Sequence, residues 1–405
     1  MSTNIIMILT ATIAALVLFR PALLASPTWR ATVTPLASII GSGFLVAGPV
    51  LAHVAGNWAW AAMLFLCVAA YMFGAAIRYN IAHVEEMIEQ GEKGPLLFLE
   101  RASDLALAFA YFISVCYYIN LFASFALKAD GIVDQWTGRI IATVVIAALG
   151  LIGTLRGLRA LEHVEVAAVA TKLALIAGLI TALAYAAFLA FNGGTFHLAE
   201  INHDTGGEEL SVLLGLIILV QGFETSRYLG NTYDRRTRIR TMIYAQAIAT
   251  AIYLAFILLV TPLFPRDLPA VGGETQIIDM IASLGSAAAP LVILTALASQ
   301  LSAAMADLNG AAGLVSGATR GRIPVRGGYF ATALVAIAVT WSADIFEIIA
   351  YASKAFVLYY GIQCVQALLA TFEVKKRDIL PQRIVFIAGI ALAVLVLVFG
   401  TPAAA

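Results

Sequence analysis

The sequence predicts an all-α protein that crosses a membrane many times. Hydrophobic residues make up 61% of the 405 residues and charged residues only 12%, and the mean hydropathy is +0.93. Soluble domains carry about 25% charged residues. Apolar runs of about 18 or more residues, the length of a helix that spans a bilayer, recur along the whole chain. Together these observations predict a polytopic helical membrane protein.

About twelve apolar runs are predicted to span the membrane as helices. They cover residues 4–25, 34–55, 57–79, 103–127, 138–155, 161–192, 209–230, 240–263, 285–318, 327–342, 345–371 and 382–400. The first run is expected to be an extra N-terminal helix rather than a signal peptide, because no basic segment precedes it. The last run is expected to be one additional C-terminal helix.

The basic residues predict the orientation, since short cytoplasmic loops hold an excess of Lys and Arg. With the loop after the first run placed inside, nineteen of the 24 Lys and Arg residues lie at inner positions. The outer loops keep only Lys128, Arg139 and Arg266. Both termini are therefore predicted to lie outside the cytoplasm, and the expected location is the cell membrane, in a bacterium the inner membrane.

The composition argues against several other classes of protein. The formal net charge is zero, whereas nucleic-acid binding needs a clustered basic excess. Cys67, Cys116 and Cys364 lie within apolar runs at no ligand-like spacing, and the histidines share no helical face, so neither a disulfide nor a metal site is expected. Because the sequence has no nucleophile elbow or zinc-protease motif, we expect no enzyme activity and no cofactor.

The second apolar run contains glycines near mid-membrane, where no water is present to form hydrogen bonds with the backbone of an interrupted helix. The run "TPLASIIGSGFLVAGPV" (34–50) places Ile40, Gly41, Ser42 and Gly43 near mid-membrane. Interrupted helices persist at this depth only where protein or a water-filled cavity satisfies the freed backbone groups. Transporters use such breaks to bind substrates. Close helix packing through small residues is the alternative explanation.

A second interruption is predicted in the seventh run. The stretch "LLGLIILVQGFETSRYLG" (213–230) places Val220, Gln221, Gly222 and Phe223 in mid-span. Two broken helices at corresponding positions indicate an inverted repeat with a binding site at its interface. The predicted organisation is an N-terminal helix (1–30), a first repeat of five helices (31–192), a second repeat of five helices (209–371) and a C-terminal helix (372–405).

Five short stretches of the chain carry a family resemblance. They are "IIGSGFL" (39–45), "GPLLFLERA" (94–102), "TKLALIAGLI" (171–180), "QGFETSRYLGNTYDRRTRIRTMI" (221–243) and "SGATRGRIP" (316–324). In this order and spacing they resemble the amino acid, polyamine and organocation (APC) superfamily over about residues 34–371. The resemblance implies the five-plus-five inverted repeat of the leucine transporter, with alternating access around broken core helices 1 and 6. The chain departs from the family in its extra N-terminal helix, its single helix after the tenth core helix, and the lack of prolines after residue 230.

Lys172 is a candidate functional residue inside the sixth apolar run. It follows Glu165 by seven residues, which places it roughly 10 Å into the apolar layer, too deep for its ammonium group to reach water easily. The APC resemblance implies that Lys172 contacts backbone carbonyls of the broken first core helix and serves as the proton-coupling group. The alternative is a lysine that only braces two helices.

Four further polar residues are candidates for coupling or gating. Glu224 and Arg227 are three residues apart, so a helix would place them on one face as a buried ion pair or gate; the other interpretation is that Glu224 binds a substrate ammonium. Ser302 and Asp307 lie in the ninth run. Asp307 is expected either to pair with Lys172 or to join helices by hydrogen bonds.

The sequence therefore predicts a secondary active transporter that moves an amino acid or related amine, with protons as the coupling ion in symport. The N–H groups freed at Gly41 to Gly43 are expected to hold a carboxylate, and the carbonyls around Val220 to Gly222 an ammonium. The alternatives are a carrier of an inorganic cation or an uncharged solute on the same scaffold, and a non-transporting membrane sensor. Apart from substrate, proton and lipid bilayer no partner is expected, and the oligomeric state is left open.

Overall fold

The computed structural model describes residues 3–41, 43–91, 94–157, 162–194, 207–230, 232–264, 272–373 and 379–403, and within these ranges it contains helices and no strand. The α-helices are α1 (Thr3–Leu18), α2 (Pro21–Leu24), α3 (Pro27–Ile39), α4 (Gly43–Ala55), α5 (Ala59–Tyr79), α6 (Glu85–Glu89), α7 (Pro95–Ala129), α8 (Gln135–Arg156), α9 (Glu162–Asn192), α10 (Gly207–Leu214), α11 (Arg235–Val260), α12 (Ile277–Ile281), α13 (Ala288–Ala318), α14 (Val325–Ser342), α15 (Ile345–Glu373) and α16 (Leu380–Phe399). Shorter segments of other helix types are η1 (Gly56–Trp58), η2 (Asn80–Val84), η4 (Ile217–Val220), η5 (Phe223–Leu229), η6 (Thr261–Leu263), η7 (Gly273–Thr275) and η8 (Ala282–Leu284).

Eight helical segments of the described chain are long and apolar enough to cross a membrane, which confirms the predicted class of all-α polytopic membrane protein. The first predicted span, 4–25, is not one continuous helix. It is divided into α1 and α2 at Arg20, which has an extended backbone with φ −60° and ψ 130°. The cause is Pro21, because a proline disfavours helical geometry in the residue before it. The total of twelve spans remains a prediction.

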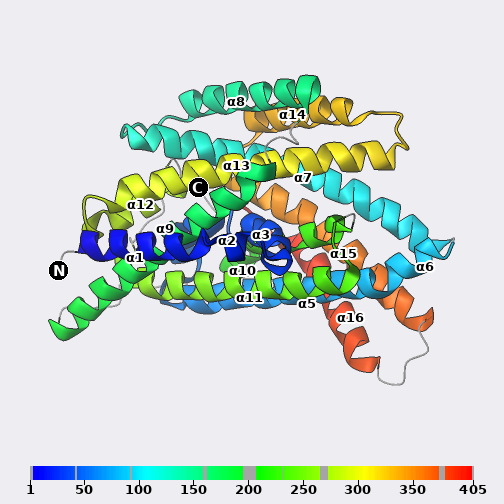
Figure 1. The fold of residues 1–405 in the computed structure, drawn as a ribbon, viewed down its shortest axis with the longest axis horizontal. Coiled ribbons are helices and arrows are strands. Elements are labelled where there is room, and N and C mark those ends of the chain that lie inside the picture. Colours follow the sequence, from blue (N-terminus) through cyan, green and yellow to red (C-terminus); the bar gives the residue numbers. More distant parts are fainter. Residues whose placement is uncertain are drawn as a thin grey trace.

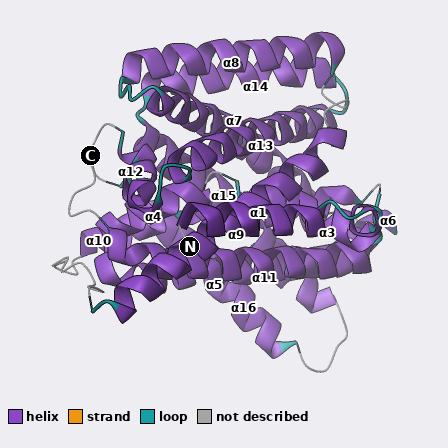
Figure 2. Ribbon diagram, turned by 60° about the vertical axis from the view of Figure 1, so that its left-hand side comes forward, coloured by secondary structure: helices purple, strands orange, loops and turns teal. Residues whose placement is uncertain are grey.

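Two groups of long helices lie side by side (Figures 1 and 2). In one group α7 packs on α13 and α8 on α14, and both pairs are also joined through α7 with α8 and α13 with α14. This group lies at the top of both views, with α8 and α14 outermost. In the other group, at the lower edge of Figure 1, α11 packs against α3, α5 and η5.

The pairing within the first group supports an internal repeat. In the predicted organisation α7 and α8 are the third and fourth core helices of the first half, and α13 and α14 are those of the second half. Helices at the same position in the two predicted halves lie in contact: α7 contacts α13, and α8 contacts α14. An inverted repeat brings matching helices of its two halves together in this way, and the repeat itself remains a prediction.

The extra N-terminal helix α1 packs along α9. A Cβ atom added at Gly178 of α9 would lie 2.6 Å from the carbonyl oxygen of Met7, so the missing side chain lets the two helices touch. At the start of α1, the Asn4 side chain donates a hydrogen bond to Ser286 at 3.3 Å. These contacts hold α1 against the outside of the predicted repeat, next to the helix that carries Lys172.

Candidate functional site

The first predicted helix break is present in the structure. Helix α3 ends at Ile39 and α4 begins at Gly43, so among the described residues the interruption falls on Ile40 and Gly41. The Gly41 N–H donates to Ser38 O at 3.1 Å, and Ser42 lies outside the described residues. The break leaves the last carbonyls of α3 and the first N–H groups of α4 without partners within their own helices.

The second predicted break is also present. Helix α10 ends at Leu214, and the chain continues as η4, an extended Gln221 and then η5. Both η segments are 3₁₀ helices, a tighter form that is common at functional hinges. Gly222 has a φ of +117°, which residues with a side chain rarely adopt.

The two breaks touch each other through backbone atoms. A Cβ atom at Gly43 would lie 2.4 Å from Leu219 O, and one at Gly222 would lie 2.6 Å from Ile39 N. No real Cβ contact is so short, so only glycine at these two positions permits the approach. The N-terminus of α4 is thereby brought against the end of η4. The predicted substrate residues that the structure describes, including Val220 and Phe223, consequently lie in one buried region.

Tyr253 of α11 joins the two breaks. Its hydroxyl oxygen lies 2.8 Å from Ile39 O and 2.6 Å from Leu219 O, within hydrogen-bond distance of one freed carbonyl from each break. Sequence reasoning missed Tyr253, because a tyrosine within an apolar helix usually indicates aromatic packing. The position of its hydroxyl depends on how α11 is rotated about its own axis, and the spacing of residues in the sequence does not reveal this rotation.

Lys172 contacts the broken first helix. Its Nζ donates to Ala37 O at 2.9 Å and to the hydroxyl of Ser299 at 3.2 Å, and the residue is only 6% exposed. Ala37 lies in the last turn of α3, where the carbonyls lack helical partners and the helix dipole favours a cation. Ser302, the serine named as a coupling or gating candidate, lies about one turn further along α13 than Ser299 and is half-buried.

Two buried side chains beside the second break have oxygen atoms without hydrogen-bond partners among the described residues. Gln221 donates to the Tyr118 hydroxyl at 2.8 Å, but its Oε1 accepts no hydrogen bond. Glu224 accepts from Gly222 N and from the Tyr360 hydroxyl, each at 2.8 Å, through Oε2. Its Oε1 has no partner. Buried acceptors are almost always satisfied in folded proteins, so such atoms at a helix break indicate a place for a donor.

The predicted ion pair between Glu224 and Arg227 is not among the ion pairs of the described residues. Glu224 instead turns back to the N–H of Gly222, which the break has freed from helical bonding. Of the two expectations for Asp307, the contact present is a hydrogen bond that joins two helices, and a pair with Lys172 is not among the ion pairs of the described residues. Asp307 accepts a hydrogen bond from Ser114 of α7 and interacts electrostatically with Glu224, which puts both carboxyl groups in the same buried region.

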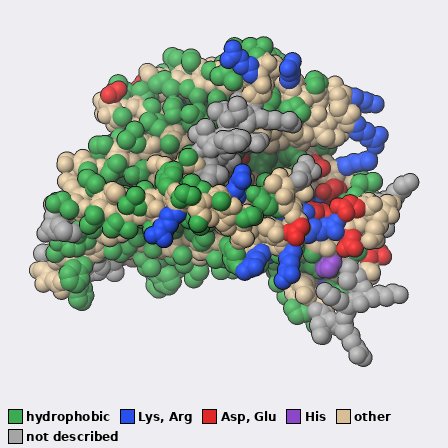
Figure 3. Space-filling view, viewed as in Figure 1, with side chains coloured by type: hydrophobic (Ala, Val, Ile, Leu, Met, Phe, Trp, Pro, Cys, Tyr) green, Lys and Arg blue, Asp and Glu red, His purple; other side chains and the backbone are tan. Residues whose placement is uncertain are grey.

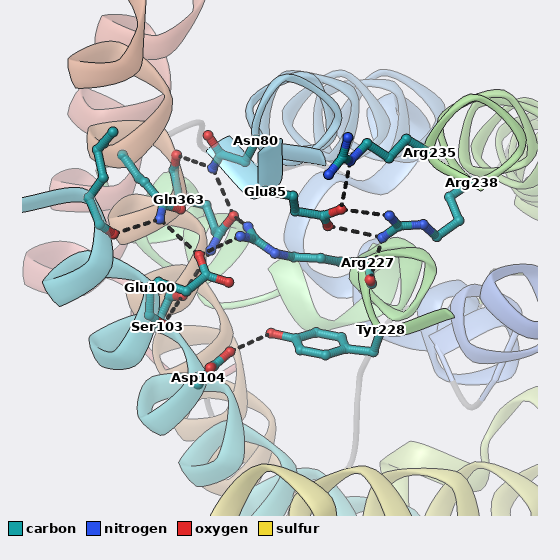
Figure 4. A network of polar contacts seen from close by, with 12 residues as sticks. Asn80, Glu85, Glu100, Ser103, Asp104, Arg227, Tyr228, Arg235, Arg238 and Gln363 are labelled. Atoms are coloured by element: carbon teal, nitrogen blue, oxygen red, sulfur yellow. Dashed lines mark hydrogen bonds and ion pairs between the residues drawn. The ribbon is translucent and has the colours of Figure 1, made fainter. Parts of the chain in front are cut away.

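Arg227 is the centre of a polar network at the other end of the second broken segment (Figure 4). Its Nη2 lies 2.5 Å from Glu100 of α7, and its Nη1 donates to the side chain of Gln363 on α15. Gln363 in turn donates to Ser103 at 2.9 Å and accepts from Asn80, the first residue of η2, at 2.8 Å. The network thus ties η5 to three other helical elements.

Arg238 extends this network to α11. It makes a two-pronged ion pair with Glu85, at 2.9 and 2.6 Å, and donates to Arg227 O at 2.7 Å (Figure 4). Helix α11 starts after Asp234, whose carboxylate accepts from Thr237 N at 2.8 Å. The hydrogen bonds from Thr237 lower the pKa of Asp234. This cap fixes the first turn of α11, from which Arg238 reaches Glu85.

The network lies at the charged end of the molecule. Figure 3 shows Lys and Arg gathered with Asp and Glu at the end where α6 lies, while the rest of this face is largely hydrophobic. This is the end that the distribution of basic residues predicts to face the cytoplasm.

Replacing Glu100 by glutamine is expected to lower the free energy of unfolding by about 3 kcal/mol, because the Arg227 charge would stay buried without its carboxylate. The Arg227 side chain is 3% exposed. Glu86→Gln is the matched control, since the Glu86 side chain is 54% exposed and 4.0 Å from Arg235; its expected effect is below about 1 kcal/mol. Denaturant titration in detergent measures both, and equal effects would contradict a structural role for the Arg227 pair.

Comparison by sequence relates the chain to transporters. A family model described as an APC superfamily transporter matches residues 21–400. An uncharacterised protein of Aquifex aeolicus (strain VF5) is 39% identical over 376 residues, which make up 92% of this chain and 90% of that protein.

Two solved structures are similar in fold at 13% sequence identity. One is a mutant of the Eremococcus coleocola manganese transporter, with a TM-score of 0.57 over 92% of this chain and 87% of that chain. The other is a Na⁺-coupled sialic acid symporter in a substrate-bound outward-open state, with a TM-score of 0.56 over 98% of this chain and 96% of that chain. At this level of identity the likeness concerns the fold alone.

Proposed function

The chain belongs to the APC superfamily of transporters, and from this premise we propose that it is a proton-coupled symporter of an amino acid or a related amine. Its substrate site is the region where the two helix breaks meet, formed by Ile40 to Gly43 and Val220 to Phe223. It works by alternating access in the cytoplasmic membrane, with both chain termini outside the cytoplasm.

The observation that carries this proposal is the contact between the breaks together with the acceptors left open beside it. Gln221 Oε1 and Glu224 Oε1 are buried without partners among the described residues, and an ammonium group supplies the N–H donors that they lack. On the opposite side, the first turn of α4 presents N–H groups at the positive end of a helix dipole, which favours a carboxylate. An amino acid satisfies both sides at once.

Lys172 is the coupling residue in this proposal. Protonated, it holds Ala37 O and Ser299 and so ties α3 to α9 and α13. When the proton leaves, the ammonium loses its charge and its attraction for the end of α3 weakens. Ala37 precedes Gly41 by four residues, about one helical turn, so release of α3 is transmitted directly to the substrate region.

Arg227 and Glu100 form the inner gate of this proposal. Their ion pair, with the Arg238 and Glu85 pair beside it, holds the inner half of the second broken segment against α7 and α11. Release of the substrate to the cytoplasm requires both pairs to separate. Because both ion pairs are largely buried, the inner end is expected to be either closed, with both pairs formed, or open, with both pairs broken.

A carrier of an inorganic cation is the second candidate, and one observation favours it. Glu224 and Asp307 interact electrostatically in the buried region, and two carboxylates attract a cation. Against it, the described residues contain no group of three or more His, Cys, Asp or Glu placed to hold a metal ion. Glu224 and Asp307 serve equally as counter-charges for an organic ammonium.

A ligand screen followed by transport measurements tests the proposed function. Purified protein is heated with amino acids, amines and inorganic ions in turn, and a ligand at about 100 times its Kd is expected to stabilise the protein by about 2.7 kcal/mol. Ligands that stabilise are then tested for uptake into liposomes with and without an inward proton gradient. Stabilisation by inorganic ions alone would contradict the organic substrate and support the second candidate.

A further inference from the structure

A pocket of about 60 Å³ lies at the end of the molecule opposite the Arg227 network. It is lined by the last turns of α7, the start of α8, η7 and the junction of α14 with α15. Ser124 lines it, and Glu100 of the Arg227 network lies 24 residues earlier on the same helix, about 36 Å away. The pocket is therefore separate from the inner gate and lies on the side predicted to face outward.

Glu274 has an unsatisfied oxygen in this pocket. The residue is 6% exposed, and its Oε2 has no hydrogen-bond partner among the described residues. The carboxyl group also takes part in a hydrogen bond with Ser124, near the end of α7, and in backbone hydrogen bonds within η7 and its N-cap. A buried carboxylate oxygen without a partner costs free energy unless a ligand completes it.

The charges around the pocket favour a cation. Three carboxyl groups lie at or next to the lining: Asp134, Glu274 and Asp344. Arg139 is the one basic residue among the lining residues, and it donates to Ala343 O at 3.1 Å. Lys128 is already paired with Asp279 at 2.7 Å. The described surroundings thus carry an excess of negative charge.

We propose that this pocket binds a small monovalent cation, with the Glu274 carboxylate as its anchoring ligand and the Ser124 hydroxyl beside it. The cation is either a free inorganic ion or the ammonium group of an incoming substrate, and only the second source rests on the function proposed above. A single water needs about 10–15 Å³ of such space, so the pocket has room for a small cation with a few waters.

The Glu274 carboxyl group has a raised pKa, because of burial first and of the nearby Asp344 charge second. The folded protein therefore binds more protons than the unfolded chain between the ordinary value of 4.5 and the raised pKa, and the free energy of unfolding is expected to fall as the pH rises through that window. Glu274→Gln should remove the contribution of this residue to the decrease in the free energy of unfolding with rising pH, and a saturating concentration of cation should reduce that decrease. The charged groups around the pocket are Asp134 and Arg139 in its lining, Asp344 just before α15, and the Lys128–Asp279 pair, which joins α7 to α12.

Thermal unfolding of the full chain in detergent tests the site. Sodium chloride and methylammonium chloride are titrated separately at constant ionic strength against choline chloride. We expect saturable stabilisation by at least one of the two probes, and Glu274→Gln should weaken it at least tenfold through loss of a charge-assisted contact. Glu208→Gln, at the exposed start of α10, is the control and should change it less than about twofold.

Two further variants keep the test decisive. If Glu274→Gln does not fold, Ser124→Ala should weaken cation binding about fivefold through loss of a neutral hydrogen bond.

Glu224→Gln should abolish substrate uptake yet leave this cation binding unchanged, which separates failure of this site from failure of the proposed function. Saturation by sodium alone identifies an inorganic ion, and saturation by methylammonium identifies an ammonium group. No saturable stabilisation by either probe, or equal binding by Glu274→Gln, would overturn the proposal.

Discussion

Lys172→Gln is expected to abolish accumulation of the substrate in a proton gradient. With one proton per substrate, a gradient of one pH unit drives about tenfold accumulation, since a tenfold ratio corresponds to about 1.4 kcal/mol. Glutamine can still donate a hydrogen bond to Ala37 O but cannot carry a proton. The internal concentration should therefore reach only the external one, while binding and downhill exchange continue. Uptake into liposomes with and without the gradient measures this.

Lys354→Gln is the matched control for this experiment. Lys354 is the other lysine within a predicted span, on α15, and it is half-buried. Its replacement should leave the gradient-driven accumulation close to that of the natural protein. Full accumulation by Lys172→Gln would contradict the coupling role and leave Lys172 as a brace between α9 and α3.

Gly222→Ala is expected to have the largest effect on folding. Alanine would be strained at a φ of +117°, and its Cβ would lie 2.6 Å from the Ile39 nitrogen and from Ser38. The two costs together are about 4 kcal/mol, enough to remove most folded protein from the membrane. Size-exclusion chromatography of a fluorescent fusion measures the folded fraction.

Gly313→Ala is the control for this substitution. Gly313 lies within α13, and no atom comes within 4 Å of the position of an added Cβ. Alanine has the higher helix propensity, so the expected change in the free energy of unfolding is within about 1 kcal/mol and favourable. Equal losses of folded protein for both variants would contradict the close contact between the breaks.

The sequence predicted the features that depend on residue type alone. Gly41, Gly43 and Gly222 indicated the two breaks because they lie at corresponding mid-membrane positions in two runs, although each alone is also compatible with close helix packing. Lys172 was recognised because a charge in an apolar run is costly. Its distance of roughly 10 Å from the edge of the apolar layer was also enough to indicate a contact with protein rather than with water.

The partners of these residues could not be predicted, because they depend on helix rotation and long-range packing. Arg227 pairs with Glu100, which is 127 positions away, rather than with Glu224, which is three positions away. Lys172 contacts Ser299, which is 127 positions further along the chain. The carbonyls that meet the Tyr253 hydroxyl belong to two different breaks, and nothing in the spacing of residues links them.

The π-helical segment η2 had no sequence signal either. It covers residues 80–84, directly after α5, and Asn80 donates a hydrogen bond to Gln363. Such segments are single wide turns inserted into α-helices, often at functional sites. Its composition, Asn-Ile-Ala-His-Val, is compatible with an ordinary helix, and it packs against α15, α5 and α11.

Ligand protection of a cysteine at position 38 tests most directly whether the two breaks hold the substrate. Ser38 is 8% exposed and lies against Gly222, and the natural cysteines Cys67, Cys116 and Cys364 are at most 3% exposed, so background labelling by a small thiol reagent should be low. In the Ser38→Cys variant, a transported ligand at about 100 times its Kd should slow labelling at least tenfold. Ser286→Cys, in the exposed turn before α13, should react equally with and without the ligand. An unchanged labelling rate at position 38 under saturating ligand would show that the substrate binds elsewhere.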